Sequence, residues 1–350
     1  MRAHQGTTHM SMTDDASLPV VGISMGDYNG IGPELINALL ADPITPKRCV
    51  PVVYGDGRIL AHYRDLLEQT HDAPRPLPEK QKPHPDGGAY LVQCWEDEQT
   101  VQPGEVTKEA GRCAYEALRA ATADLQSGRI DALVTAPINK ANIQREDFAF
   151  PGHTEYLMSV AGADDALMLM VADALRVGVV TGHVPLRSVP GQITTERVRS
   201  KLKLLYQSLR EDFSITKPKI ALLGVNPHAG EEGLLGQEEQ QVLRSIIEGE
   251  RYAGRLVYGP YPADGFFGSG HHRKFDGVLA MYHDQGLVPF KTLSFGQGVN
   301  YTAGLPFVRT SPDHGTAYDL AGKGRADAGS MRAALRLATN VVRTHREDAS

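Results

Sequence analysis

Short apolar runs alternate along the chain with longer stretches whose apolar residues recur every three or four positions. In the first half, four runs rich in β-branched residues predict strands, at 18–26, 49–55, 89–95 and 130–136. The stretches 33–42 and 107–128 between them carry the helical period, with small and apolar residues on one face. Residues 71–88 are rich in proline and charge and are predicted to form a surface loop.

The second half of the chain repeats this alternation. Strands are predicted at 166–172, 175–182, 219–226 and 277–283, and helices at 195–212, near 237–249 and at roughly 327–344. Strands that alternate with helices in this way are typical of α/β proteins with largely parallel sheets. We therefore expect an α/β fold.

Composition narrows the class of protein. The 350 residues are 41% hydrophobic and 22% charged, and the net charge of −6 argues against a dedicated nucleic-acid binder. No apolar run approaches the ~18 residues that span a bilayer, so no membrane partner is expected. Residues 1–17 are polar, lack the apolar core of a signal peptide and are predicted to be a disordered leader.

The cysteines, Cys49, Cys94 and Cys113, are odd in number and form no C-x-x-C pair. This usage argues against a disulfide framework and against a cysteine zinc site. It favours reduced thiols and a cytoplasmic location.

A glycine-rich stretch, "SMGDYNGIGPELI" at 24–36, follows the first predicted strand. The dinucleotide fingerprint G-x-G-x-x-G/A would suit this place, but none of the five G-x-G pairs in the chain completes it. Pro33 at the first helical position and Glu34 near the positive helix end fit a simple strand-to-helix turn. Composition alone leaves that turn and a ligand-binding loop equally open.

Three histidines each end or immediately follow a predicted strand: His183, His228 and His283. In a parallel sheet these positions lie at the carboxyl edge, where three imidazoles could hold a divalent cation. Their spacing is no metal signature, and a single histidine at such a position is more often a hydrogen-bonded structural group.

Anion-binding groups form a second set. His153 and Thr154 stand at a predicted helix start, where free amides favour an anion, and Thr154 could also cap the helix without preventing such binding. Lys291, Asn300 and Arg309 suit a phosphate or carboxylate, although the two cations could also be ordinary surface charges.

Acidic residues are less distinctive. Asp284 adjoins His283 and could orient an imidazole, while Asp264 could be a base, a metal neighbour or a turn residue. Glu231, Glu238 and Glu239 are interpreted as solvated helix charges without a role.

Two motifs at opposite ends of the chain resemble isocitrate and isopropylmalate dehydrogenases. "GDYNGIGPE" is similar to their opening loop, and "DHGTAYDLAGKGRAD" at 313–327 to their adenine-side loop. With "TAPINKANI", "FPGHTEYL", "TGHVPLRSVP", "NPHAGEEGLLGQEE", "GPYPADGFF" and "AMYHDQGLVPFK" between them, the series resembles the 4-hydroxythreonine-4-phosphate dehydrogenase family of vitamin B6 biosynthesis. The resemblance spans about 18–342.

The resemblance implies two α/β domains with mainly parallel sheets and a central cleft. Residues 18–135 plus 300–350 would form the first domain, and 136–299 the second, which would carry most metal and substrate ligands. It also implies a homodimer in which each active site is shared between the subunits.

For the site, the resemblance implies a role for each matching residue. The metal ligands would be His183, His228 and His283, and the substrate contacts His153, Thr154, Lys291, Asn300 and Arg309. The cofactor would lie by Gly30, Gly32, His314, Gly315 and Thr316. Catalytic roles are expected for Asp264, Asp284 and Lys291. The implied cofactors are NAD or NADP and one divalent cation, either zinc, magnesium or cobalt.

The implied reaction is oxidation of 4-phosphooxy-L-threonine followed by decarboxylation to 3-amino-2-oxopropyl phosphate, in pyridoxal phosphate biosynthesis. The alternatives are a sister dehydrogenase for 4-phospho-D-threonate, erythronate or a dihydrodiol carboxylate, a phosphate acyltransferase of the same fold, and a non-catalytic metal- or phosphate-binding protein. The chain departs from the family at Tyr28-Asn29, where Pro-Ala is common, and this pair could alter the wall of the cofactor or substrate site.

Overall fold

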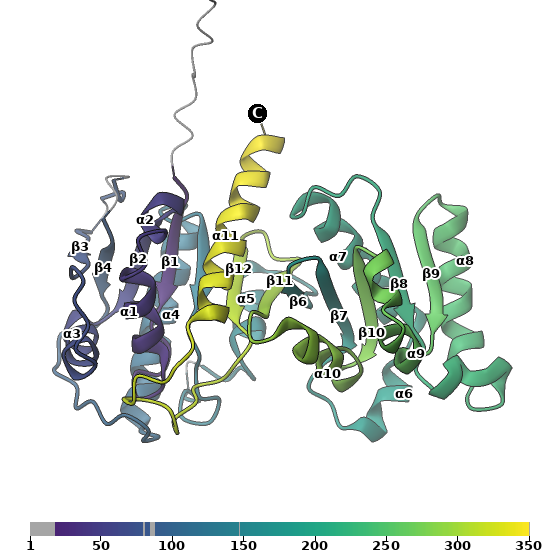
Figure 1. Cartoon of the computed structure of the whole chain (residues 1–350), viewed down its shortest axis with the longest axis horizontal. Coiled ribbons are helices and arrows are strands. Elements are labelled where there is room, and N and C mark those ends of the chain that lie inside the picture. Colours follow the sequence, from purple (N-terminus) through teal and green to yellow (C-terminus); the bar gives the residue numbers. More distant parts are fainter. Residues whose placement is uncertain (1–17, 80, 85–87, 147, 350) are drawn as a thin grey trace, which may run out of the picture.

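The computed structural model describes residues 18–79, 81–84, 88–146 and 148–349. The predicted leader, residues 1–17, lies outside this part of the chain. Figure 1 shows a long sheet with helices packed on both of its faces. The sheet has twelve strands in the order β3-β4-β2-β1-β5-β12-β11-β6-β7-β10-β8-β9.

The strands are short and mostly buried. Their bounds are β1 Val20–Ser24, β2 Val50–Gly55, β3 Arg75–Pro76, β4 Tyr90–Gln93, β5 Ala132–Thr135, β6 Leu167–Ala172, β7 Leu175–Thr181, β8 Lys219–Leu223, β9 Leu256–Tyr261, β10 Gly277–Tyr282, β11 Val299–Ala303 and β12 Val308–Pro312. The pairs β11–β12, β11–β6 and β6–β7 are antiparallel, and the other pairs are parallel. Strands β11 and β6 therefore join two parallel blocks in the middle of the sheet.

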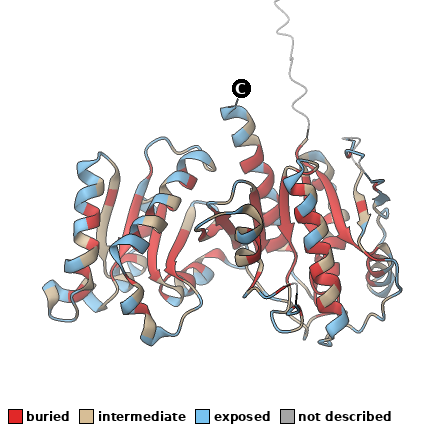
Figure 2. Ribbon diagram, turned by 180° about the vertical axis from the view of Figure 1, so that it is seen from behind, coloured by how far each residue is buried: buried red, intermediate tan, exposed pale blue. Residues whose placement is uncertain are grey.

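The helices lie on the two faces of the sheet and in the connections between its strands. They are α1 Gly32–Leu40, α2 Thr45–Arg48, α3 Gly57–Leu66, α4 Lys108–Gln126, α5 His153–Ala161, α6 Val189–Gln192, α7 Thr195–Glu211, α8 Arg244–Tyr252, α9 Ala263–Gly268, α10 His283–Ser294 and α11 Gly329–Asp348. Further helical turns lie at Leu186–Ser188, Pro227–Gly233, Glu239–Leu243 and His271–Lys274. Figure 2 shows that the buried residues follow the strands and the inward helix faces.

The predicted α/β class and mostly parallel sheet are confirmed. Helix α4 begins where the Thr107 hydroxyl accepts a hydrogen bond from the Ala110 amide at 3.2 Å, and it buries the small and apolar face that the sequence predicts. The predicted loop at 71–88 contains only the two-residue strand β3 in its described part. Among the described residues, no helix is both long and apolar enough to cross a membrane.

The predicted division into two domains stays a prediction. The sheet runs without interruption from the predicted first domain into the second, since β11 pairs with β6. Most buried apolar side chains form one large cluster, and a smaller one lies between α10, α9 and strands β7, β8 and β10.

Candidate functional site

A cavity of about 280 Å³ lies where the two parallel blocks meet. Strands β5, β6, β11 and β12, the start of α5 and the inner side of α10 contribute its walls. The predicted site residues in these walls are His153, Thr154, His183, His283, Lys291, Asn300, Arg309, His314 and Gly315. The fold thus brings together both parts of the predicted site, the anion-binding groups and two of the histidines.

Arg309 of β12 is the most deeply placed cation in this cavity, with 2% of its surface exposed. Its guanidinium donates hydrogen bonds to the hydroxyls of Thr135 at 2.6 Å and Thr302 at 3.1 Å, on neighbouring strands. Its Nε has no partner, and no salt bridge to Arg309 is found among the described residues. Burial lowers the pKa of Arg309 to about 10, so it stays cationic at neutral pH. A buried cation that lacks a carboxylate partner is an anion-binding group.

His153 opens helix α5 beside this arginine. Gly152 holds the N-cap position without a side-chain capping bond, so the capping role considered for Thr154 is not seen. The His153 Nε2 atom is buried and has no partner. Burial, together with Arg309 and Lys140, holds the pKa of His153 well below its usual value, so the imidazole is neutral. The free amides and dipole of the helix start favour an anion here.

Lys291 and Asn300 complete this group from α10 and β11. The Lys291 ammonium is exposed and donates to the Asp313 carbonyl at 3.3 Å. The amide oxygen of Asn300 is buried without a partner and lies in the cavity wall. Both side chains therefore retain hydrogen-bonding capacity for a ligand.

His183 and His283 lie at the ends of β7 and β10, and their ring centroids are 5.8 Å apart. The Nδ1 atom of His283 is 2.7 Å from a carboxylate oxygen of Asp284, so it carries the proton and leaves Nε2 free as an acceptor. Burial, then Lys140 and His283, lower the pKa of His183. Two adjacent imidazoles of this kind suit a divalent cation.

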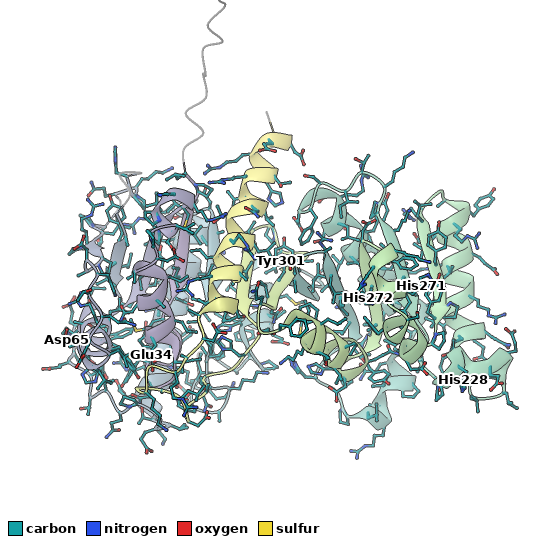
Figure 3. All side chains as sticks on the ribbon, in the orientation of Figure 1. Glu34, Asp65, His228, His271, His272 and Tyr301 are labelled. Atoms are coloured by element: carbon teal, nitrogen blue, oxygen red, sulfur yellow. The ribbon has the colours of Figure 1, made fainter. Side chains whose placement is uncertain are left out.

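His228 follows β8 at the same edge but does not line the cavity. It is exposed, and Figure 3 shows it at the lower end of the β8–β9 side, far from Tyr301 in the centre of the sheet. Within the described part of the chain, no group of three His, Cys, Asp or Glu side chains is placed to hold a metal ion. The three-histidine site therefore stays a prediction, with two members adjacent in a single chain.

The predicted catalytic carboxylates lie outside the main cavity. Asp284 is exposed and contacts His283, next to a second hollow between the His183 loop and the start of α10. Asp264 is exposed in the first turn of α9. Lys291 is the predicted catalytic residue that reaches the cavity itself.

The predicted cofactor loops lie against one another. Gly30 and Gly32 are buried, and a Cβ atom on Gly30 would lie 2.8 Å from the Thr316 carbonyl oxygen. The Ile31 amide donates to that same oxygen at 3.0 Å. His314 and Gly315 line the cavity next to this contact. The glycines of the opening loop thus allow two chain segments to meet.

The Tyr28-Asn29 pair points into the protein rather than into the cavity, since both residues are buried. The Asn29 side chain accepts from the Gln102 amide at 2.8 Å and donates to the Thr107 hydroxyl at 3.2 Å. The carbonyl of Tyr28 accepts from the Tyr63 hydroxyl at 2.8 Å.

Sequence reasoning did not assign several residues at the cavity. Thr135 orients Arg309, and Lys140 and Glu155 lie in the cavity wall. Each occurs in one of the motifs that carry the family resemblance, but the sequence does not show which residues of a motif face the cavity. The interpretation of Glu239 as a solvated charge is wrong, since the residue is 1% exposed and accepts backbone hydrogen bonds.

The fold and this cavity define an α/β protein that can bind an anionic ligand beside a pair of adjacent histidines. Residues 47–338 match the family described as "Pyridoxal phosphate biosynthetic protein PdxA", and the chain belongs to this family. It is 44% identical to a 4-hydroxythreonine-4-phosphate dehydrogenase of Bacteroides thetaiotaomicron, over 94% of this chain and 90% of the relative.

Solved structures agree with this assignment. A 4-hydroxythreonine-4-phosphate dehydrogenase from Klebsiella pneumoniae has a TM-score of 0.81 and 36% identity, covering 94% of this chain and 99% of its own. A terephthalate 1,2-cis-dihydrodiol dehydrogenase from Burkholderia xenovorans has a TM-score of 0.62 and 26% identity, covering 93% of this chain and 98% of its own.

Proposed function

We propose that the protein is a 4-hydroxythreonine-4-phosphate dehydrogenase. It would oxidise 4-phosphooxy-L-threonine with NAD or NADP and decarboxylate the product to 3-amino-2-oxopropyl phosphate, a step towards pyridoxal phosphate. One observation carries the proposal: Arg309, a buried cation without a carboxylate partner, shares a cavity with the His183 and His283 pair. The names of the relatives supply the reaction.

The phosphate would be held by the amides at the start of α5, with the side chains of Thr154, Lys291 and Arg309 around it. Asn300 on β11, the strand next to that of Arg309, would hydrogen-bond the substrate. These contacts fix the anionic substrate in one orientation, and much of the rate enhancement in such a reaction comes from positioning.

A divalent cation fits beside His183 and His283. A lowered pKa favours the neutral form of His183, and the Asp284 carboxylate fixes a proton of His283 on Nδ1, which leaves Nε2 as the ligand atom. When bound, zinc, cobalt or magnesium would polarise the reacting oxygen and stabilise the enolate that remains after loss of CO2. We propose that the third histidine, His228, comes from the second subunit of a homodimer.

The cofactor would supply the hydride acceptor, beside the loop that begins at His314 and Gly315. Gly30 and Thr316 would support that loop from behind, because they pack against one another, and Gly32 lies in the same opening loop. In the oxidation, NAD or NADP would accept the hydride of the carbinol carbon, and the hydroxyl proton would pass to a carboxylate of the protein. Lys291 would hold an anionic end of the substrate, and Asp284 would orient His283. Asp264 would accept the hydroxyl proton.

Glu155 favours an amino-acid phosphate over the sugar-acid phosphates used by a sister dehydrogenase. Its carboxylate lies in the wall of the same cavity as His153 and Lys140, and it would attract the substrate ammonium group. A phosphothreonate or a dihydrodiol carboxylate lacks this ammonium group and would face the carboxylate without a partner.

A dehydrogenase assay tests the proposal. Purified protein with Co²⁺, Zn²⁺ or Mg²⁺ should produce NADH or NADPH from 4-phosphooxy-L-threonine, with release of CO2. Turnover of 4-phospho-D-threonate alone would refute the substrate assignment. No turnover of either acid with any of these metals would refute the proposed activity.

We also propose a cytoplasmic location. The thiols of Cys49, Cys94 and Cys113 are free in the structure, and Cys49 and Cys113 are buried. Burial raises the pKa of Cys49 and Cys113 to about 12, so both stay protonated and unreactive. Fractionation of cells that express the protein would test this location.

A further inference from the structure

The turn that carries His228 has a left-handed backbone. Five consecutive residues have positive φ, namely His228 at 53°, Ala229 at 51°, Gly230 at 79°, Glu231 at 41° and Glu232 at 56°. L-amino acids visit this region as single residues, because the Cβ atom approaches the following carbonyl oxygen. A run of this kind persists only when the surrounding structure holds it in place, and such strain is typical of functional sites.

Glu239 fixes this part of the chain in place. Its carboxylate is buried and accepts hydrogen bonds from the Val225 amide at 2.7 Å and the Asn226 amide at 2.8 Å, just before the turn. Its other oxygen accepts from the Asn226 side chain at 3.0 Å, and Glu238 accepts from the same amide at 2.7 Å. The carboxylate therefore fixes the chain at the entry to the left-handed turn.

The turn itself also packs closely against Glu239. A Cβ atom on Gly230 would lie 2.6 Å from the second Glu239 oxygen, and one on Gly224 would lie 2.9 Å from the Ala229 Cα atom. Glycine is required at both positions by space, and at Gly230 also by its positive φ. The outward side of the turn is free, since His228 itself is exposed.

We propose that Glu239 is a positioning residue for the metal site, which it serves by holding the left-handed turn so that His228 is presented outward, to the cavity of a partner subunit. The inference rests on the proposed function, in which His228 acts across a dimer interface. A ligand on a pre-ordered turn loses little conformational freedom when it binds. A flexible turn would instead lower the metal affinity.

Metal binding tests this without a catalytic assay. The full-length protein is titrated with Co²⁺ alone, and the visible d–d absorption reports affinity and ligand geometry. Glu239→Gln keeps one acceptor oxygen but sets an NH2 group against the Asn226 side-chain amide. We expect it to weaken Co²⁺ binding by about 10- to 100-fold, the usual range for residues that orient a metal ligand. Phosphate binding at Arg309 should not change.

Two further variants make the result specific. Glu232→Gln is the matched control, because Glu232 lies in the same turn but makes only an exposed ion pair with Arg244, and it should bind Co²⁺ like the parent. Gly230→Ala disturbs the same turn while Glu239 stays intact, and it should weaken Co²⁺ binding as Glu239→Gln does. If Glu239→Gln does not fold, Gly230→Ala takes its place in the experiment.

His228→Ala separates the two proposals. If it leaves Co²⁺ binding unchanged, the proposed three-histidine site is refuted, and with it the role of Glu239. If His228→Ala weakens binding while a folded, dimeric Glu239→Gln or Gly230→Ala protein binds Co²⁺ like the parent, the metal site stands and the positioning role of Glu239 is overturned.

Discussion

At the scale of single residues, the site depends on polar groups that the fold buries without partners. Arg309 crosses from β12 to hydroxyls on β5 and β11, and so has one fixed orientation at the joint of the sheet. His153 keeps a buried ring nitrogen unpaired beside it. Such groups reduce stability in the absence of a ligand, because a buried polar atom without a partner loses its hydration. A ligand that pairs with them recovers this free energy as affinity.

Arg309→Lys should therefore impair substrate binding strongly. A lysine cannot reach both threonine hydroxyls and the ligand together, and a hydrogen bond to a charged group contributes roughly 1.5–3 kcal/mol. We expect kcat/KM to fall by about 10- to 100-fold, mainly through KM, with a similar loss in phosphate affinity by calorimetry. Arg332→Lys, which changes a half-exposed arginine paired with Asp42, is the control. Equal phosphate affinity in the two variants would contradict the assignment.

His153 predicts a pH dependence of stability. Its folded-state pKa is lowered, so below the ordinary histidine value the unfolded chain binds more protons than the folded chain. Stability should fall as the pH drops from 7 towards 5, with a limiting slope of about 1.4 kcal/mol per pH unit from this group. His345, whose pKa is raised by Asp212, contributes in the opposite sense, and its stabilisation is lost as the pH rises.

Urea unfolding of the parent and of His153→Asn between pH 5 and 7 isolates this effect, because the other histidines are common to both proteins. The stability difference between the two proteins should shift in favour of His153→Asn as the pH falls. Parallel curves would show that the histidine titrates equally in the folded and unfolded states.

At the scale of elements, the sequence predicts most strands and helices that are built on an apolar period, and misses β11, β12 and α10, which carry site residues. Strands β11 and β12 contain Asn300 and Arg309, which break the apolar run expected of a buried strand. Helix α10 contains Gly286 and Pro289, which both disfavour helix. Gly286 is needed there because a Cβ atom would lie 3.0 Å from Ala280 and Val177 side-chain carbons.

The opening loop shows a different limit of sequence reasoning. Its glycines are predicted to lie by the cofactor, and its Tyr28-Asn29 pair could alter the wall of the cofactor or substrate site; the structure shows that all four residues are buried, with Gly30 against Thr316. Asn29 holds the segment at Gln102 and Thr107 through its side chain. A loop that binds a ligand and a loop that binds another loop need the same small residues and hydrogen-bonding groups. The sequence alone therefore could not separate them.

Asn29→Ala tests the structural role. Loss of two buried hydrogen bonds should lower the free energy of unfolding by about 1–3 kcal/mol, measured by denaturant titration. The KM values for cofactor and substrate should stay close to those of the parent. A stable variant with a strongly raised KM for NAD or NADP would instead place Asn29 at the cofactor site.

At the scale of the whole molecule, the proposed active site is incomplete in one chain. His183 and His283 face the cavity, whereas His228 is presented outward on its left-handed turn. Exposed apolar side chains lie a few residues along the chain from each of these histidines, with Leu186 72%, Val288 62% and Leu234 78% exposed. Exposed apolar side chains are common where a protein surface is covered by a partner, and these support the proposed homodimer.

Mixed dimers test this arrangement. His228→Ala and His283→Ala should each be inactive alone, because every site in either homodimer lacks one ligand. When the two proteins are unfolded together and refolded, a mixed dimer contains one complete site, built from the His183 and His283 of one chain and the His228 of the other. Random pairing in a two-fold dimer should restore about a quarter of the parent activity. His183→Ala mixed with His283→Ala should restore none, since each chain then damages its own cavity. Recovery in that control, or its absence in the first mixture, would rule out a site shared in this way.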